Sequence, residues 1–226
     1  MAAKDIREFP AYSLAEAARY LHVPVATLRS WVLGRTYPRG GGIAAFEPLI
    51  DMPRSNGKRL SFNNLVEAHV LRALRMSHGV RIDAVRPALT YAEDALGIER
   101  LLLSEQLLTA GGDLFLDRFG ELINLSKSGQ LALRRLLEAH LRRVDRDDHE
   151  LPIRLYPFLG SDLPDAKSIV IDPRVSFGRP TVAGSGVSTE ALIGRVDAGE
   201  TIEGIARDYD LTVAQVESAV LYEKAA

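Results

Sequence analysis

Hydrophobic residues recur at the spacing of an α-helix near the start of the chain. Ser13 and Glu16 have the spacing of a capping box, in which each side chain satisfies a free amide of the first helical turn. Pro24 disfavours helical geometry in the residue before it and suits the first turn of a second helix, which Gly34 ends. The pattern therefore predicts two short helices joined by a tight turn within residues 13–33.

Residues 35–60 have the turn chemistry of a small two-stranded ribbon. Three glycines precede an apolar run at 43–46, and a second apolar run follows at 49–50. The tripeptide Ser-Asn-Gly at 55–57 is a strong tight-turn signal, because Asn and Gly tolerate positive φ. We expect the tip of the ribbon here, surrounded by the cationic side chains of Arg54, Lys58 and Arg59.

The rest of the chain is predicted to be mostly helical. The apolar periodicity predicts helices over residues 61–78, 82–95, 126–143, 189–197, 202–209 and 213–223. Alternation of apolar and polar residues predicts a hairpin at 114–116 and 122–125, and short strands are expected at 151–158 and 168–171. The charged run at 145–150 is interpreted as a solvated link.

These elements predict a mainly α-helical protein with small β elements. We expect a winged helix-turn-helix at 12–96, a middle hairpin plus helix at 98–165 that connects or dimerises, and a three-helix, helix-turn-helix-like module at 166–226. The 226 residues are 46% hydrophobic, which is ordinary for a globular chain with a core.

Charge divides the chain in two. The overall net charge is −2, but residues 1–90 carry 13 lysines and arginines against 7 acidic residues, a net of +6. Residues 91–226 carry a net of −8. The basic part contains the first helix pair, whose outward residues are Thr27, Arg29 and Ser30. Because an arginine on a helix in the major groove can donate two bonds to guanine, this face is a candidate DNA reader; the alternative is a structural helical hairpin.

The sequence YSLAEAARYLHVPVATLRSW at 12–31, the wing, and LSFNNLVEAHVLRALR at 60–75 together resemble the MerR-type winged helix-turn-helix. The resemblance implies DNA contacts from the second helix and the wing, through Thr27, Arg29, Ser30, Arg54, Lys58 and Arg59. The wing is longer and richer in glycine than is usual, and no long dimerisation coil follows. Without cysteine, the metal sensing of some such regulators is not implied.

Residues 168–222 resemble a domain-of-unknown-function family found in VapB-type antitoxins. The matching pieces include Ile-Asp-Pro at 171–173, Phe-Gly-Arg-Pro at 177–180 and Ala-Gly-Glu at 198–200, whereas Gly186 stands where an arginine is usual. Paired with the winged region, this module is similar to antitoxins that repress their own operon and neutralise a PIN-domain ribonuclease. The resemblance therefore implies double-stranded DNA and a toxin as partners.

The second helix-turn-helix differs from the first in charge. Residues 188–226 hold 8 acidic and 3 basic side chains, and the last helix offers Gln215, Glu217 and Ser218 outward. Because DNA phosphates repel such a surface, we favour a packing or partner-binding role over a second DNA reader.

The chain lacks the residue combinations that common catalytic sites use. There is no cysteine, the five histidines are scattered, and neither a G-x-S-x-G elbow nor an H-E-x-x-H pair occurs. His69 and His140 lie on or beside apolar stripes and are interpreted as core or boundary residues. We expect no enzyme activity, cofactor or metal site, no membrane segment, and a cytoplasmic location.

The sequence thus predicts a DNA-binding antitoxin of a type II toxin–antitoxin system, acting as a homodimer. Arg174 and Arg179 lie in an irregular loop and are the candidate toxin contacts, since an arginine can displace metal or substrate among the carboxylates of an Mg²⁺-dependent ribonuclease. Two alternatives stay open. One is a stand-alone winged helix-turn-helix regulator without a toxin partner, and the other is an interaction module that binds no DNA.

Overall fold

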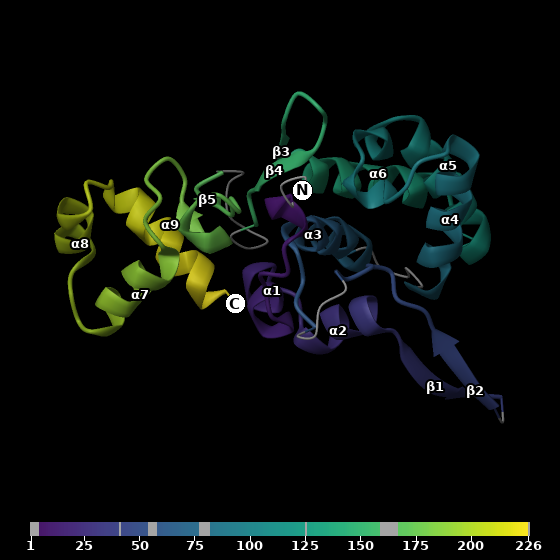
Figure 1. Ribbon diagram of the computed structural model, residues 1–226, viewed down its shortest axis with the longest axis horizontal. Coiled ribbons are helices and arrows are strands. Elements are labelled where there is room, and N and C mark those ends of the chain that lie inside the picture. The colour runs from purple at the N-terminus through teal and green to yellow at the C-terminus, as the bar shows by residue number, and fades with distance from the viewer. Residues whose placement is uncertain are drawn as a thin grey trace.

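The protein is described by a computed structural model over residues 5–40, 42–53, 58–76, 82–124, 126–158 and 167–225. The described chain is mainly helical and has three small antiparallel sheets of two strands each. This confirms the predicted fold class. Figure 1 shows the C-terminal helices at one end, the middle helices at the other, and the β1–β2 ribbon projecting from the body.

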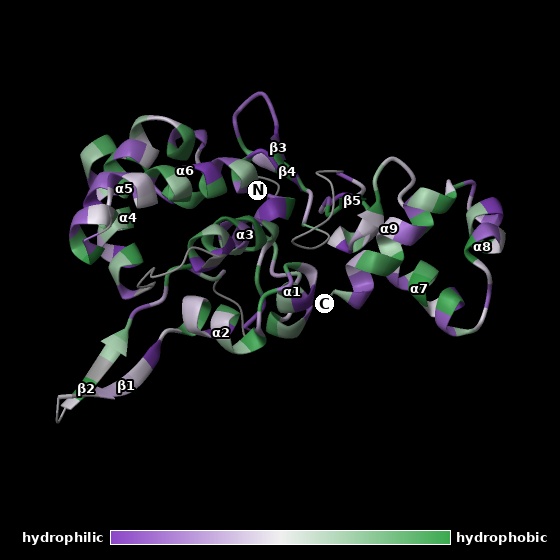
Figure 2. Cartoon of the chain, turned by 180° about the vertical axis from the view of Figure 1, so that it is seen from behind, coloured by the Kyte–Doolittle hydropathy of each residue, from purple (hydrophilic) through white to green (hydrophobic). Residues whose placement is uncertain are grey.

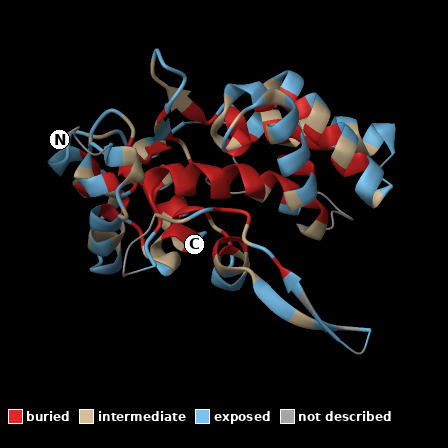
Figure 3. Cartoon of the chain, turned by 45° about the vertical axis from the view of Figure 1, so that its right-hand side comes forward, coloured by how far each residue is buried: buried red, intermediate tan, exposed pale blue. Residues whose placement is uncertain are grey.

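The N-terminal part contains the predicted helix pair, ribbon and long helix. After a 3-10 turn at Ile6–Glu8, its elements are α1 (Leu14–Tyr20), α2 (Val25–Leu33), β1 (Arg35–Arg39), β2 (Gly42–Phe46) and α3 (Phe62–Met76). Helix α3 is buried on every side over residues 61–70, and Figure 3 shows it crossing the centre of the molecule. A helix that is apolar on one stripe by sequence is thus a core helix in the fold.

The middle part adds three helices and a short hairpin. Its elements are the 3-10 turns Ile82–Ala84, Leu101–Leu103 and Glu105–Leu108, with α4 (Val85–Leu96), α5 (Ala110–Ile123), α6 (Lys127–Leu141), β3 (Val144–Arg146) and β4 (Pro152–Leu155). Gly97 ends α4 in the left-handed conformation, and Ser126 caps α6, close to the predicted helix boundaries. These helices share one hydrophobic core with α1, α2 and α3.

Two sequence predictions fail in this middle part. The hairpin expected at 114–125 is wrong, because α5 spans Ala110–Ile123. The buried residues Phe115, Leu116 and Phe119 follow helical spacing. Within a few residues this spacing also reads as alternation of apolar and polar positions, which is why the sequence pattern predicts a hairpin there. The solvated link expected at 145–150 is also wrong in part, because Val144–Arg146 pairs with β4 and only the loop after it is exposed.

The C-terminal part has its own small core. Its elements are β5 (Ile169–Val170), a 3-10 turn at Ser176–Gly178, β6 (Thr181–Val182), α7 (Thr189–Asp197), α8 (Ile202–Asp208) and α9 (Val213–Lys224). Thr201 caps α8, and Thr212 with Gln215 forms the predicted capping box of α9. Helix α9 packs on the β5–β6 pair, and α7 and α8 pack on α9, which places Leu192, Ile205 and Val216 in a second core.

Candidate nucleic-acid interface

The helix pair α1–α2 is held in place by its caps. Ser13 and Glu16 exchange bonds with each other's amides at 3.2 and 2.8 Å, which confirms the capping box. Pro24 precedes α2 and its carbonyl accepts from the amides of Thr27 and Leu28. Because Leu28, Trp31 and Val32 are buried, the opposite face of α2 is turned toward solvent.

The three residues predicted on that face differ in how free they are. Arg29 is exposed and, within the described part of the chain, has no ion-pair partner. Thr27 is half-buried and accepts a hydrogen bond from Arg75, and the Ser30 hydroxyl donates to the Thr27 carbonyl at 2.8 Å. Of these three side chains, Arg29 is therefore the one that is exposed and whose guanidinium can bind a ligand.

Arg75 belongs to the same surface and was missed by the sequence reasoning. It is exposed, lies in the last turn of α3, and reaches α2 through its bond to Thr27. Its position one turn after Arg72 was the available signal, but only the packing of α3 against α2 shows which arginine reaches the reader helix.

The ribbon exists, but its tip is not where the sequence placed it. Strands β1 and β2 pair from Arg35 opposite Phe46 to Arg39 opposite Gly42, so the chain reverses direction between Arg39 and Gly42. Gly40 has φ +56, and a Cβ there would meet nothing within 4 Å. The glycine run, interpreted as the lead-in to the ribbon, is the turn itself.

None of the cations expected around the tip belongs to the two described strands of the ribbon. Arg54 falls outside the described residues. Lys58 and Arg59 are exposed and lie just before α3 in the chain. Arg59 donates to the Ala11 carbonyl at 2.7 and 3.2 Å and lies 3.5 Å from the Glu16 carboxylate, so its side chain braces the entry to α1.

The ribbon carries a cation of its own. Arg35 is exposed at its base, and its guanidinium lies 5.7 Å from the centre of the Tyr37 ring. Figure 2 shows the base of β1 as hydrophilic and beside α2. Arg29, Arg35 and Arg75 thus give α2 and its flanks a cationic surface.

A buried cluster of histidines and arginines lies behind this surface. The rings of His69 and His140 have centres 4.9 Å apart, and both pack against the ring of Phe158. The guanidinium groups of Arg72 and Arg143 lie 5.5 and 4.4 Å from the centre of that ring. Burial lowers the pKa of His140 to about 4 and that of His69 well below its ordinary value. Both histidines are therefore neutral core residues, as the sequence predicts.

The helix-turn-helix also contacts the C-terminal helix. His22, in the turn between α1 and α2, lies 4.8 Å from Tyr222 of α9, ring centre to ring centre. The Tyr222 hydroxyl donates to the Tyr20 carbonyl at 2.8 Å, and Arg19 lies 3.7 Å from the Glu223 carboxylate. The two parts of the chain therefore meet at the base of the reader helix.

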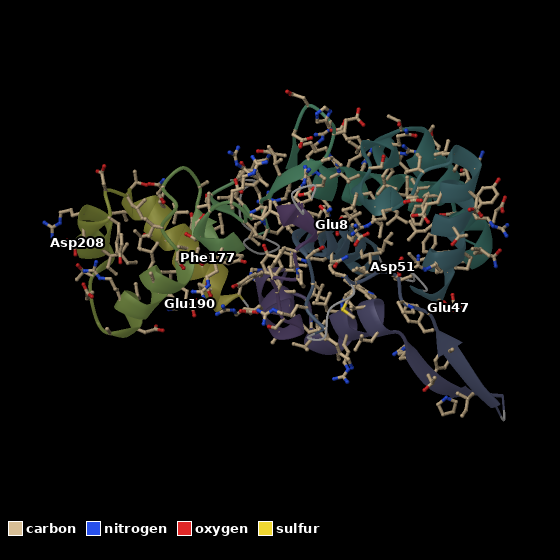
Figure 4. The ribbon with its side chains drawn as sticks, in the orientation of Figure 1. Glu8, Glu47, Asp51, Phe177, Glu190 and Asp208 are labelled. Carbon is tan, nitrogen blue, oxygen red and sulfur yellow. The ribbon has the colours of Figure 1, made fainter. Side chains whose placement is uncertain are left out.

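The second helix pair offers a different surface. On α7 and α8, Arg195 is paired with the carboxylates of Glu200 and Asp208, the latter at 2.6 Å, and Figure 4 shows Asp208 at the far end of the molecule. Arg174 and Arg179 are exposed in the loop before β6 and lie on the C-terminal part, not beside α2. These two arginines and Arg29 therefore serve separate surfaces.

Two negative findings bear on the site. In the described ranges, no three histidine, aspartate or glutamate side chains gather as a metal site would require. None of the helices that the structure describes has the length and apolar content needed to cross a bilayer.

Known proteins resemble both parts of the chain. Residues 10–89 match a family described as "Putative DNA-binding HTH domain", and residues 169–222 match "Protein of unknown function (DUF433)". Over 232 residues the chain is 35% identical to "Putative antitoxin VapB45" of Mycobacterium tuberculosis, which covers 94% of this chain and 93% of that protein. It is 27% identical over 228 residues to "Uncharacterized protein Rv2308" of the same organism, with 94% and 90% covered.

A solved structure has the same arrangement. The crystal structure of Rv2018 from Mycobacterium tuberculosis matches with a TM-score of 0.68 and 30% sequence identity, over 94% of this chain and 97% of that one. Because these likenesses run the whole length, the helix-turn-helix part and the C-terminal module are joined in the relatives as they are here.

Proposed function

The chain belongs to the family of the "Putative antitoxin VapB45", and from this premise we propose that it is the antitoxin of a type II toxin–antitoxin system. In this proposal the protein binds operator DNA through α2 and the ribbon, and binds a PIN-domain ribonuclease through its C-terminal part. The free, exposed Arg29 on the solvent-facing side of α2 is the observation that carries the DNA-binding half.

The order α1, α2, ribbon, α3 is that expected of a MerR-type winged helix-turn-helix. A module of this size buries little surface on DNA, so we propose that two copies bind a two-fold operator and repress transcription. Arg29 would read a base edge, while Arg35 and Arg75 would contact phosphates on either side. The protein would act in the cytoplasm, where operator and toxin are found.

The toxin half rests on charge and on the family. A PIN-type ribonuclease that uses Mg²⁺ needs carboxylates around its metal, and Arg174 and Arg179 are exposed cations that could enter such a site. The acidic helices α7 and α8 would then serve packing and partner contact instead of DNA.

Gel shifts with the DNA upstream of the gene test the DNA half. Wild-type protein should bind, and its affinity should fall between 50 and 200 mM salt as counterions are released, a range of about 10³–10⁵ for proteins with many phosphate contacts. Replacing Arg29 by Ala should cost about 1–3 kcal/mol at one base position of the operator. Arg135→Ala, an exposed arginine on α6, should leave binding unchanged.

An equal loss for Arg29→Ala on every DNA sequence would make this residue a phosphate contact instead of a base reader. Co-expression tests the toxin half: the protein encoded by the neighbouring reading frame should arrest growth alone and be neutralised by this chain. DNA binding without such a toxin would favour the stand-alone regulator.

A further inference from the structure

The loop between β5 and β6 contains a run of unusual backbone. Ser176, Phe177 and Gly178 have φ values of +47, +57 and +75 in succession. Glycine adopts such angles freely, but a bulky residue such as phenylalanine rarely does. Strained backbone of this kind persists where the surrounding structure determines it, and it clusters at functional sites.

This loop is firmly braced. The Arg174 amide donates to the Asp172 carboxylate at 2.8 Å, and the Ser176 hydroxyl donates to the Gly186 carbonyl at 3.2 Å. Gly178 packs so closely on Tyr12 that a Cβ there would lie 2.2 Å from the tyrosine hydroxyl. The loop conformation is therefore part of the fold.

The effect of this bracing is to hold the Phe177 ring in solvent. Phe177 is 93% exposed, although burial of a phenylalanine side chain stabilises a fold. Figure 4 labels its position on the C-terminal part. Ile6 and Phe9, at 45% and 54% exposed, add apolar surface. They line a hollow of about 190 Å³ that Phe177 and Pro173 border.

A second hollow lies on the other flank of the loop. It has a volume of about 380 Å³ and is lined by Arg154, Tyr156, Val175 and Gly186, among others. An exposed aromatic ring between two hollows has the shape expected of a protein-binding surface. In such an interface an aromatic anchor enters a pocket of the partner, and side chains of the partner fill the hollows around it.

The same surface is positively charged, against the trend of its half of the chain. Residues 167–187 contain three cations, Lys167, Arg174 and Arg179, and one acid, Asp172, although residues 91–226 carry a net of −8. Lys167 is paired with Asp145 at 3.0 Å, so the charge of this surface comes from the two arginines. Asp172 is buried and its carboxylate is 3.1 Å from Arg154. Within the described part of the chain, neither Arg174 nor Arg179 forms an ion pair, although Arg179 is near enough to Glu16 to help lower the pKa of that carboxyl. A partner must therefore present carboxylates around an apolar socket.

We propose that Phe177, flanked by Arg174 and Arg179, is the anchor through which this chain docks on its toxin; this rests on the proposed function. The ring enters an apolar socket of the toxin, and the two arginines pair with carboxylates beside it. We name the three residues the Phe177 surface.

Charge and chemistry favour a protein toxin over DNA. DNA would satisfy the arginines but offers no apolar socket on its backbone. A second copy also carries exposed carboxylates, among them Glu203 and Asp210, so its docking is distinguished below by the oligomeric state.

Two substitutions at Phe177 test the anchor without disturbing the fold. Asn tolerates the left-handed conformation, so Phe177→Asn removes the ring and should leave the melting temperature unchanged or higher. Its Kd for the purified PIN-domain protein of the neighbouring reading frame, measured by calorimetry, should rise about 30-fold or more. Phe177→Trp should stay within about threefold of wild type. Tyr91→Asn, at a 48% exposed tyrosine of α4, is the matched control and should bind as wild type.

The charge pair is tested in the same assay. Arg174→Glu combined with Arg179→Glu should weaken toxin binding by at least about 30-fold, whereas Arg135→Glu should not. Equal toxin affinity of wild type and Phe177→Asn would overturn the Phe177 surface and leave the antitoxin function standing. Failure of the wild-type chain to bind would overturn both.

The other occupants give different readouts. If Phe177→Asn weakened operator binding as much as Arg29→Ala, the surface would be a DNA contact and the proposal would be wrong. If it converted a dimer to a monomer in light scattering, the surface would be an interface between copies, and the proposal would again be wrong.

Discussion

An arginine near a helix-turn-helix can contact DNA when its guanidinium is not held by a carboxylate of its own chain, and the arginines of this chain differ on that point. Arg29 and Arg35 are exposed and without ion pairs in the described residues, whereas Arg59 bonds to the Ala11 carbonyl and Glu16. The sequence predicts DNA contacts from both, Arg29 on the second helix and Arg59 in the wing. The fold leaves Arg29 free and uses Arg59 to brace the entry to α1.

Exchanging Arg35 and Arg59 for alanine should separate the two roles. Arg35→Ala should weaken binding to all DNA sequences and reduce the slope of log K against log salt by about 1, because one phosphate contact is lost. Arg59→Ala should leave that slope unchanged and lower the free energy of unfolding by about 1 kcal/mol, because the Ala11 carbonyl loses its donor. Salt-dependent gel shifts and urea unfolding measure the two effects. A reduced salt slope for Arg59→Ala would restore it to the DNA contact surface.

Among the elements, those with capping residues were predicted well from sequence. The capping boxes at Ser13 and Thr212 mark where α1 and α9 begin, since a cap is a local interaction that sequence encodes directly. The position of the ribbon tip was not encoded so locally. Both 40–42 and 55–57 are turn signals, and only the pairing of Arg35 with Phe46 selects the first.

Helix α5 shows why the middle part was harder to predict. Glycine is unfavourable in a helix interior, yet α5 contains Gly111, Gly112 and Gly120, all buried. Each lies where a Cβ would collide with a neighbour, so packing against the preceding turn and α6 overrides local propensity. These contacts depend on the tertiary packing and cannot be predicted from the local sequence of α5.

Substituting these glycines tests that account of α5. A Cβ at Gly112 would lie 2.1 Å from the Leu107 carbonyl oxygen, so Gly112→Ala should lower the free energy of unfolding by about 1–3 kcal/mol. Gly194, inside α7, has no atom within 4 Å of its would-be Cβ, so Gly194→Ala should raise that free energy by about 0.5–1 kcal/mol. Urea unfolding followed by circular dichroism gives both values. A neutral Gly112→Ala would argue against close packing of α5 on this turn.

In the whole molecule, two hydrophobic cores are joined by a few specific contacts. The larger core runs from Tyr12 to Ile171, so the middle helices and the winged part are packed together, and the smaller belongs to the C-terminal module. Leu155 and Ile171, both in the larger core, form a backbone bridge next to the β5 strand of the C-terminal module, and Tyr222 of the smaller core reaches the end of α1. The division into parts at residues 12–96, 98–165 and 166–226 stays a prediction about independent folding.

The Tyr222 contact should be measurable on its own. Tyr222→Phe removes the hydroxyl that donates to the buried Tyr20 carbonyl, and should lower the free energy of unfolding by about 1–3 kcal/mol because that carbonyl is left without its donor. Tyr209→Phe is the control, since Tyr209 is 36% exposed and contacts Arg195 through its ring. An effect no larger than the control's would mean that water replaces the bond, and that the Tyr222 hydroxyl does not help to join the two parts.

The buried histidines should make the whole fold sensitive to acid. His69 lies 3.1 Å from the His140 carbonyl through Nε2, and His140 lies 2.8 Å from the Leu136 carbonyl through Nδ1. The other ring nitrogen of each histidine is buried and has no hydrogen-bond partner. A second proton on either ring would therefore have no acceptor, and it would be repelled by the nearby charges of Arg72 and Arg143. Burial likewise lowers the pKa of His22 to about 4.

The sign of the pH dependence follows from these lowered pKa values. The unfolded chain binds a proton at each histidine near pH 6.5, whereas folded His22 and His140 resist protonation to about pH 4. Stability is therefore fully present above pH 6.5 and falls by about 1.4 kcal/mol per pH unit for each histidine between those values. Urea unfolding at pH 7.5, 6 and 5 measures the slope, and His140→Gln should reduce it while His149→Gln, at an exposed loop position, should not. A free energy of unfolding that does not change between pH 7.5 and 5 would mean that water reaches the histidine rings in the folded protein.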